Sequence, residues 1–96
     1  MDQAEASVTV DSDRVRVTSW TFQPGQATGM HRHELDYVVV PVSGGSFTVT
    51  APDGATSEMR QDAGQAYARQ AGVEHNVANT GQRTAVFVEV ELKAQG

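Results

Sequence analysis

Turn signals recur about every ten residues along this chain, and they limit its fold more than any other feature. They are built from glycine, proline, aspartate and serine: Pro24-Gly25, Ser43-Gly44-Gly45-Ser46, Pro52-Asp53-Gly54 and Asp62-Ala63-Gly64. The segments between them are short and rich in valine and threonine, and several alternate apolar with polar residues. Alternation with a period of two is typical of half-buried strands. No stretch carries the 3.6-residue period of an amphipathic helix, so the sequence predicts an all-β sandwich or barrel.

The clearest strand patterns lie near the two ends of the chain. Residues 7–22 predict two strands joined by a turn at Asp11-Ser12-Asp13. Residues 84–92 predict one long strand with two distinct faces. Its first face carries Val86, Val88, Val90 and Leu92, and its second carries Ala85, Phe87, Glu89 and Glu91. We expect the two glutamates to face solvent on an edge or outer surface.

The middle of the chain predicts shorter strands. Residues 31–42 read as one extended segment, and Pro41 marks an edge, a bulge or a strand end because it lacks a backbone donor. Residues 47–50 and 56–61 predict further strands around a tight turn. The aromatic side chains are expected in the core or at an interface, namely Trp20, Phe22, Phe47 and Phe87.

The length of 96 residues predicts a single domain spanning residues 1–96, with residues 1–6 polar and frayed. With 39% hydrophobic and 20% charged residues, the composition is that of an ordinary folded domain. A chain of this size buries only about 60 to 65% of the surface that it exposes when unfolded. Strand edges and apolar area are left uncovered, so we expect two copies to pair as a homodimer.

Charge and cysteine content exclude several kinds of function. The net charge is −5, and the seven basic residues are dispersed, which argues against nucleic acid or an anionic membrane as partner. The start of the chain is acidic rather than signal-like, and the longest aliphatic run is far shorter than the ~20 residues of a membrane helix. The absence of cysteine removes disulfides and thiol nucleophiles. We expect a cytoplasmic protein whose partner is a small molecule or a second copy.

The chain has three histidines, and they lie in two short segments. His31 and His33 are separated by one residue, so in an extended segment both side chains project from the same side. His75 lies far downstream, in Gly72-Val73-Glu74-His75-Asn76. One metal held by three imidazoles would use them together. The alternative is that each is an amphipathic strand residue whose polar tip is satisfied by a neighbour or by water.

The two histidine segments resemble the two signatures of the cupin superfamily. The first signature is a glycine, five residues, His-x-His, three or four residues, a glutamate, six residues and a glycine. Gly25, His31, His33 and Gly44 fit it, whereas Tyr37 occupies the glutamate position. The second signature is matched by Gly64, Gly72, His75 and Asn79, with Gln70 in the usual proline position. Together the signatures cover residues 25–79. Two strings within them, residues 31–41 and residues 71–77, are similar to short bacterial cupins, some of which carry a β-alanine-degradation label.

The resemblance implies an all-β, single-domain cupin fold, which is a double-stranded β-helix or jelly-roll barrel. It also implies one divalent transition metal held by His31, His33 and His75. Imidazole ligands suit Fe, Mn, Ni, Cu and Zn alike, so they leave the metal's identity open. With Tyr37 in place of the carboxylate, the ligand set would be neutral and would favour an anionic, bidentate ligand.

Several other side chains are candidates for the same site. Glu34 and Asp36 are an odd number of positions from His33, so in a regular strand they point to the opposite face. Only a bulge would turn one of them toward the metal. Tyr37 has the parity of His33 and is either a barrel-filling aromatic or a hydrogen-bond donor to a metal-bound ligand. Tyr67 and Arg69 share one strand face. If that face is inward, Arg69 would clamp a substrate carboxylate; the alternative is a surface arginine.

Two functions from different classes follow from the resemblance. The first is a metal-dependent enzyme, namely a dioxygenase acting on a small carboxylate-bearing metabolite. The second is a non-catalytic, metal-containing barrel that binds a ligand or dimerises. Metal-dependent isomerisation or hydrolysis would need a general base among Glu34, Asp36, Glu74 and Tyr37, and no catalytic residue is assigned from sequence. An enzyme should have a solvent-connected cavity, whereas a structural module should have one plugged by Met30, Leu35 or aromatic side chains.

Overall fold

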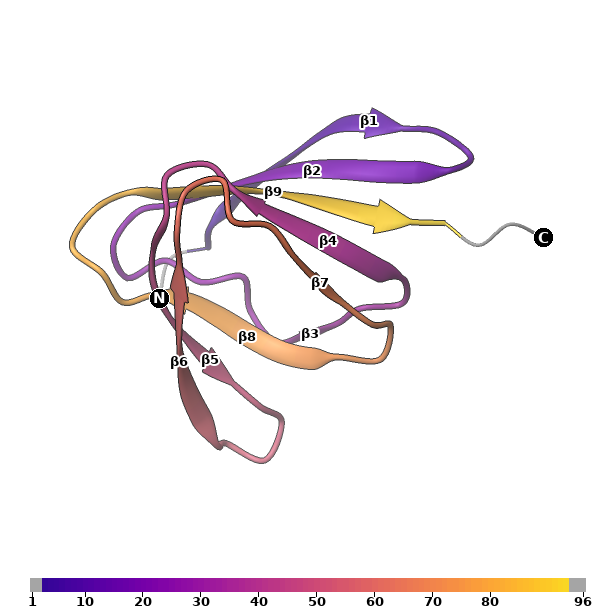
Figure 1. Ribbon diagram of the computed structural model, residues 1–96. Helices are drawn as coiled ribbons and strands as arrows, with labels where there is room; N and C mark the ends of the chain where they lie inside the picture. Colours follow the sequence, from indigo (N-terminus) through magenta and orange to yellow (C-terminus); the bar gives the residue numbers. More distant parts are fainter. Residues whose placement is uncertain (1–2, 94–96) are drawn as a thin grey trace.

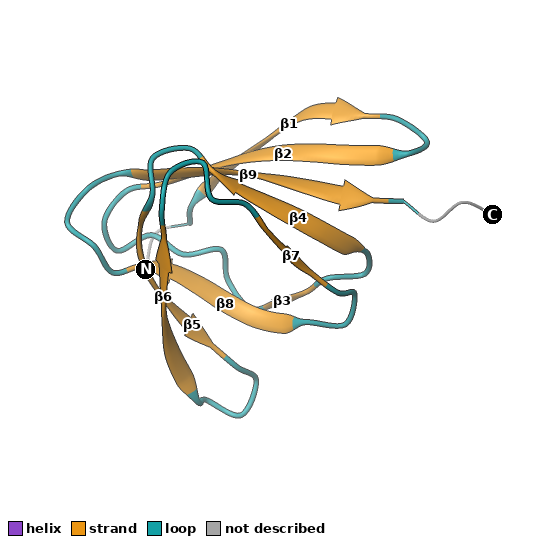
Figure 2. Cartoon of the chain, in the orientation of Figure 1, coloured by secondary structure: helices purple, strands orange, loops and turns teal. Residues whose placement is uncertain are grey.

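Two antiparallel sheets form a β-sandwich in the computed structural model, which describes residues 3–93 (Figure 1). All regular secondary structure in that range is β-strand, as Figure 2 shows. In chain order they are β1 (Glu5–Asp11), β2 (Val15–Phe22), β3 (His31–Arg32), β4 (Asp36–Pro41), β5 (Gly45–Thr50), β6 (Thr56–Gln61), β7 (Tyr67–Arg69), β8 (Glu74–Asn79) and β9 (Ala85–Leu92). One sheet has the order β1-β2-β9-β4-β7 and the other β3-β8-β5-β6. No helix long and apolar enough to cross a bilayer occurs in the described residues.

The expected segment over residues 31–42 is divided between the two sheets. Its first part, β3, pairs with β8, while its second part, β4, pairs with β9 and β7. The prediction of one continuous strand was therefore wrong, because the chain crosses the sandwich at residues 33–35. Pro41 is the last residue of β4 and is buried opposite Phe87, which confirms a strand end at that position.

Aromatic rings from both sheets meet in the core. Phe22 and Phe47 are 0% exposed, and their ring centroids lie 5.3 Å apart in an edge-to-face arrangement. Phe87 lies 5.3 Å from Phe22 and 5.9 Å from Phe47. Trp20 stacks on Phe22 at the border of this cluster. Phe22, Phe47 and Phe87 therefore lie in the core, and the partly buried Trp20 packs against it, which agrees with the expectation of a core or interface position.

The long strand near the C-terminus, β9, presents the opposite face to the interior from the one expected. Ala85 and Phe87 are buried and Glu89 is partly buried, and all three lie on the inward side. The valines of β9 lie on the outer side and remain partly exposed. The prediction that Glu89 and Glu91 face solvent on an outer surface was therefore wrong. The reason is that Phe87 fills more of the core than a valine does, and alternation carries Glu89 inward with it.

The start of the chain is more ordered than the sequence suggests. The backbone N–H of Ala4 donates to the carbonyl of Ala27 at 2.9 Å, and the Ala4 side chain is buried. Strand β1 begins at Glu5. The fraying expected for residues 1–6 is therefore not seen over residues 3–6, while Met1 and Asp2 lie outside the described residues.

Gly44 shows why a glycine is required in the turn between β4 and β5. Its φ is +75°, in the left-handed region that favours glycine. A Cβ at this position would lie 2.9 Å from the carbonyl oxygen of Gln61 and 3.2 Å from the amide nitrogen of Ala63. The close approach of these two backbones holds the chain on its path from β4, in one sheet, to β5, in the other.

Candidate metal centre

The three histidines are brought together by pairing between β3 and β8 and by the connection that follows β3. His31 and His75 are directly opposite each other in the β3–β8 register. His33 lies in the crossing between sheets, where its backbone N–H donates to Val73 at 2.8 Å and its carbonyl accepts from Gly72 at 2.7 Å. These bonds tie the His31 segment and the His75 segment into one unit, although 42 positions separate His33 from His75.

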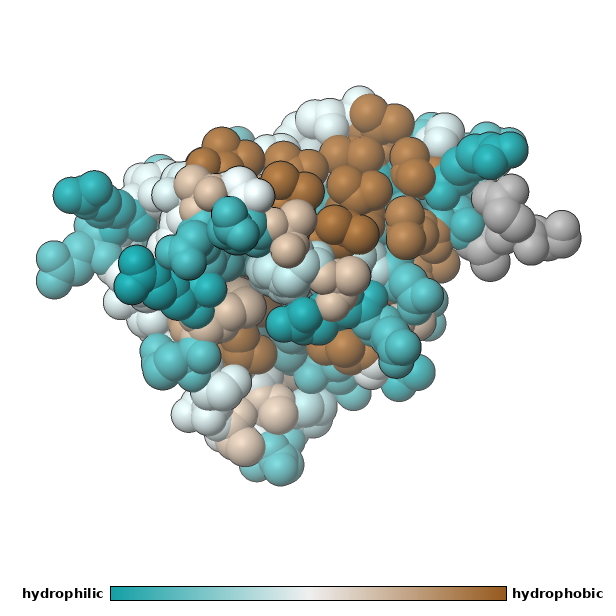
Figure 3. All heavy atoms as spheres, in the orientation of Figure 1, coloured by the Kyte–Doolittle hydropathy of each residue, from teal (hydrophilic) through white to brown (hydrophobic). Residues whose placement is uncertain are grey.

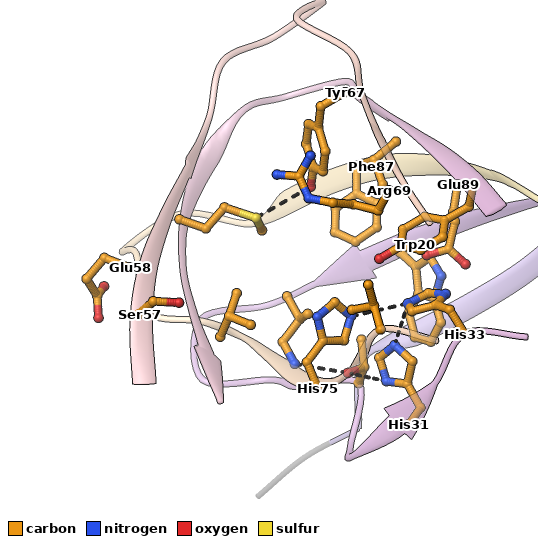
Figure 4. Close-up of a pocket in the computed structure, with 17 residues that line it drawn as sticks. Trp20, His31, His33, Ser57, Glu58, Tyr67, Arg69, His75, Phe87 and Glu89 are labelled. Carbon is orange, nitrogen blue, oxygen red and sulfur yellow. Dashed lines mark hydrogen bonds between the residues drawn. The ribbon is translucent and has the colours of Figure 1, made fainter. Parts of the chain in front are cut away.

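The three imidazoles converge through their Nε2 atoms, as the dashed lines of Figure 4 show. His31 Nε2 and His33 Nε2 are 3.0 Å apart, and His33 Nε2 and His75 Nε2 are 3.2 Å apart. A possible ligand atom from each ring lies within 4.8 Å of the others. Such a triad of nitrogen atoms is positioned to bind a metal ion on one side, with other coordination positions left to a ligand.

Hydrogen bonding and burial prepare the ring nitrogens of the cluster to act as ligands. His31 Nδ1 lies 2.9 Å from the carbonyl oxygen of Gly29, an acceptor that fixes the proton on Nδ1 and leaves Nε2 free as a ligand. Burial lowers the pKa of His33 to about 4, with a smaller contribution from the charge of His31. Burial likewise lowers the pKa of His75 to about 4. Both rings are therefore unprotonated at neutral pH, as metal binding requires.

Tyr37 occupies the position where the cupin signature has a glutamate. Its ring stacks on His33, with centroids 3.8 Å apart and planes inclined by 17°. The side chain is 3% exposed, and its hydroxyl has no hydrogen-bond partner among the described residues. Burial raises the pKa of Tyr37 to about 12, so the hydroxyl keeps its proton. A buried, unpaired hydroxyl costs free energy unless something pairs with it, so Tyr37 offers a donor to a bound molecule.

The histidines line one wall of a cavity of about 330 Å³ between the two sheets. Its other walls are largely apolar, with Trp20, Val39, Met59 and Phe87 among the lining residues. Neither Met30 nor Leu35 lines it, and Met30 is 48% exposed on the surface. The plug expected for a purely structural barrel is therefore absent from the part of the chain that the structure describes. A cavity of this volume is at the small end of the range for ligand sites.

Glu89 is the cavity residue that sequence reasoning placed wrongly. It lies on β9 opposite Val39, and Val39 in turn lies opposite Tyr67 on β7. Within residues 3–93 its carboxylate forms no hydrogen bond or ion pair, and burial raises its pKa to about 7. The sequence did contain an indication of this placement, because Glu89 shares a strand face with Phe87, the only aromatic residue of β9. Large aromatic side chains mark the core face more reliably than valines do.

Tyr67 and Arg69 lie on the inward side of β7, at the rim of the cavity. The guanidinium carbon of Arg69 lies 4.6 Å from the centroid of the Tyr67 ring, and Nη1 donates to the carbonyl of Ala68 at 2.8 Å. Tyr67 accepts a hydrogen bond from Gln61 at 2.9 Å. Arg69 is exposed, so its guanidinium is accessible from solvent.

The acidic residues next to the histidines do not join them. The carboxylate of Glu34 is exposed and pairs with Arg32 outside the cavity. Asp36 accepts from the backbone N–H of Ala71 at 2.8 Å, and Glu74 is exposed on β8. None of these three belongs to the cluster of possible metal ligands, so the bulge considered for Glu34 or Asp36 does not turn either toward it.

We expect Glu89 to make the metal-free protein less stable as pH rises. Its folded pKa of about 7 lies above the ordinary value of 4.5, so stability present below about pH 4.5 is lost as pH rises toward and beyond 7. The full effect is at most about 3 kcal/mol. Burial lowers the pKa of His33 and His75 to about 4, so these residues add stability as pH rises toward about 6.5 and partly mask the effect of Glu89. The contribution of Glu89 is therefore the difference between two proteins: the free energy of unfolding of Glu89→Gln relative to wild type should rise with pH, in denaturant unfolding followed from about pH 5 to pH 8 with a chelator present. Glu74→Gln, on the surface, is the control, and an unchanged slope in Glu89→Gln would contradict the interior placement.

Comparison with known proteins agrees with this geometry. The cupin domain family matches residues 18–91. The chain is 50% identical over 91 residues to the β-alanine degradation protein BauB of Pseudomonas aeruginosa, covering 95% of each chain.

Solved structures include a cupin domain from Bordetella pertussis with a TM-score of 0.92 and 45% identity, covering 97% of this chain and 96% of that one. A double-stranded β-helix protein from Klebsiella pneumoniae, with a TM-score of 0.77 and 23% identity over 94% of this chain and 76% of that one, shares the fold. The convergent histidines, the two-sheet sandwich and these matches show together that the chain belongs to the cupin family.

Proposed function

We propose that this cupin is a metal-dependent enzyme, a dioxygenase that acts on a small carboxylate-bearing metabolite. One observation carries the proposal: a three-histidine cluster lines an unplugged cavity beside the buried Tyr37 hydroxyl, which has no hydrogen-bond partner within residues 3–93. A structural metal site would be closed by a fourth protein ligand, and the described residues provide none near the histidines.

The residues present fit a divalent transition metal. The three Nε2 atoms are close enough to share one ion, and two of the rings are held neutral by burial. His31, His33 and His75 would hold the metal, and the cavity side would remain open. When bound, the metal would supply a Lewis acid and, for Fe, a means of activating dioxygen. In a dioxygenase reaction both oxygen atoms end in the substrate, so no separate reductant is consumed.

The chain's own residues would divide the tasks of binding and proton transfer. Arg69 would hold the substrate carboxylate at the cavity rim, where a guanidinium can bind both carboxylate oxygens. The Tyr37 hydroxyl would donate to an oxygen of the bound substrate beside His33. The Glu89 carboxyl, whose pKa of about 7 lets it gain or lose a proton near neutrality, would exchange a proton with substrate. The apolar walls would exclude bulk water.

The similarity to BauB narrows the substrate class. That protein's name places it in β-alanine degradation. A three-carbon carboxylate of that kind is small enough for a cavity of about 330 Å³. We therefore infer that the substrate is a short carboxylate related to β-alanine.

The test is oxygen consumption by protein loaded anaerobically with Fe(II) and then given a panel of three- to five-carbon carboxylates. We expect turnover with at least one of them. Replacement of Arg69 by Met should raise KM by about 10- to 100-fold with a smaller change in kcat, because the lost contact binds ground state and transition state alike. Arg60→Met, on the outer face of β6, is the matched control. Silence with Fe, Mn, Ni, Cu and Zn would instead favour a non-catalytic, ligand-binding barrel.

A further inference from the structure

The inner face of the five-stranded sheet, which forms one wall of the cavity, carries several charged side chains, whereas its outer face is largely apolar. Val38 and Val40 of β4 and the valines of β9 point outward, and Figure 3 shows the hydrophobic surface over these strands. Arg69, Glu89 and Glu91 lie on the inner side. A sheet with one face in water normally has the reverse distribution. The inner charges therefore need partners in or near the cavity.

The two glutamates of β9 differ in whether the chain supplies such a partner. Glu91 lies opposite Arg16 on β2, and Arg16 Nη1 is 3.4 Å from Glu91 Oε1. Glu89 lies opposite Thr18 on β2 and Val39 on β4, and neither of these is charged. Burial raises the pKa of Glu89 to about 7, and the charge of Glu91 raises it further. A carboxylate held in an apolar wall without a counter-ion costs free energy, which a bound cation would recover.

Arg69 lies on the other side of β4 from Glu89. It is opposite Tyr37 in the β4–β7 register, whereas Glu89 is opposite Val39 in the β4–β9 register. Two strand spacings and two residues along the strand therefore separate their Cα atoms, which is roughly 12 Å. No ion pair joins the two side chains within the described residues. Both line the pocket with the histidines (Figure 4), so the two charges are available to opposite ends of one bound molecule.

The charges of Glu89 and Arg69 both act on the tyrosine hydroxyls of the cavity. Burial is the main reason that the pKa of Tyr37 is raised to about 12, and the charge of Glu89 raises it further while that of Arg69 lowers it. Burial also raises the pKa of Tyr67, on which the two charges have the same opposing effects. The cavity therefore has an anionic and a cationic side, with the Tyr37 hydroxyl within electrostatic range of both.

We propose that Glu89 binds the ammonium group of a zwitterionic substrate whose carboxylate is bound by Arg69. This assignment rests on the proposed function, in which Arg69 holds a substrate carboxylate, and it narrows the substrate class to amino acids. Because the two side chains lie on opposite sides of β4, an amino group on the second or third carbon beyond the carboxylate fits better than an α-amino group. The ammonium is then also the group with which Glu89 exchanges a proton.

Other assignments of the acidic groups fit less well. A second metal ion would need several ligands, and Glu89 belongs to no group of three possible metal ligands within residues 3–93. Glu58, the other acidic residue that lines the cavity, is exposed, and its carboxylate accepts from the Thr48 hydroxyl at 3.0 Å. Figure 4 shows its side chain pointing away from the histidines. Glu89 is therefore the carboxylate placed to bind an ammonium group, and Glu58 provides a matched control.

Calorimetric titration of the zinc-loaded protein tests the assignment without any turnover. The ligands are 3-aminopropionate and 3-hydroxypropionate, which has the same length but no positive charge. We expect wild type to bind 3-aminopropionate about 10- to 100-fold more tightly, the range that a hydrogen bond between charged groups provides. Glu89→Gln should reduce this preference to less than about 3-fold while keeping its affinity for 3-hydroxypropionate, because only the contact with the ammonium is lost. Glu58→Gln should keep the full preference.

The outcomes separate failure of this assignment from failure of the proposed function. Equal binding of both acids, weakened alike by Arg69→Met, would leave the carboxylate site standing and overturn the role of Glu89. A preference that persists in Glu89→Gln would also overturn it, because the metal rather than Glu89 would then bind the amine. Absence of binding by either acid would overturn both proposals. A cooperative thermal transition shows that Glu89→Gln is folded, and Glu89→Asp, which keeps the charge, should retain part of the preference.

Discussion

Replacement of His75 by Ala is expected to abolish stable metal binding. His75 is the one ligand that β8 supplies, and its Nε2 lies 3.2 Å from that of His33. Two imidazoles bind a metal much more weakly than three, so we expect at least a 100-fold loss of metal affinity. Mutation of a residue that only hydrogen-bonds to a metal ligand already lowers metal affinity by about 10- to 100-fold. Metal analysis after dialysis should fall from about one ion per chain to near zero. The measurement is made on protein prepared without a histidine tag.

Thermal unfolding gives a second readout of the same change. A metal present at about 100 times its Kd stabilises the folded state by about 2.7 kcal/mol, which corresponds to a Tm increase of roughly 10 to 20 °C for a domain of this size. Wild type and Glu74→Ala, whose altered side chain is exposed beside His75, should both show the increase. His75→Ala should show none. An equal increase in all three proteins would mean that the histidines do not form the metal site.

Replacement of Phe47 by Ala is expected to cause a large loss of stability. The Phe47 side chain is 0% exposed and packs at 5.3 Å from Phe22 and 5.9 Å from Phe87. Removing a buried phenyl ring costs about 3 to 5 kcal/mol, against a total stability of about 5 to 15 kcal/mol for a typical domain. The Tm should fall by roughly 15 to 30 °C.

Met30→Ala is the control for that measurement. Met30 is 48% exposed and lies outside the core, so its truncation should change the free energy of unfolding by no more than about 0.5 kcal/mol. Phe47→Leu, which keeps most of the volume, covers the case in which the alanine variant does not fold. A loss of less than about 1 kcal/mol for Phe47→Ala would contradict the position of Phe47 at the contact between the sheets.

Local features were predicted from sequence because they depend on neighbours along the chain. Glycine- and proline-rich turns and period-two alternation gave an all-β fold, and Pro41 was placed at a strand end. The pairing of His31 with His33 depended only on the alternation of side chains in an extended segment. The addition of His75 followed from the fact that the chain has just three histidines, and the resemblance to cupins strengthened it. Tyr67 and Arg69 were put on one face of a strand, and the structure places both at the cavity.

The wrong predictions concern which face of a strand turns inward. Residues 85–92 offered a valine face and a mixed face, and local pattern does not say which of them meets the opposite sheet. Phe87 decided between them, because its ring packs against both Phe22 and Phe47. Glu89 was carried into the cavity and the valines to the surface by that one contact. The break of residues 31–42 into β3 and β4 has a similar cause. The backbone of β3 hydrogen-bonds to β8 in one sheet, whereas that of β4 hydrogen-bonds to β9 in the other.

The sequence by itself determined that this chain forms strands, where it turns, and that its histidines belong to a cupin-like pair of segments. Only the tertiary structure decided that three Nε2 atoms converge and that one outer face is aliphatic. It also decided that Glu89 and the Tyr37 hydroxyl have no hydrogen-bond partner among the described residues. Backbone φ and ψ and side-chain parity are local quantities, whereas burial depends on which distant strands pack against each other. The chemistry of the candidate site therefore depends on how distant strands pack against each other.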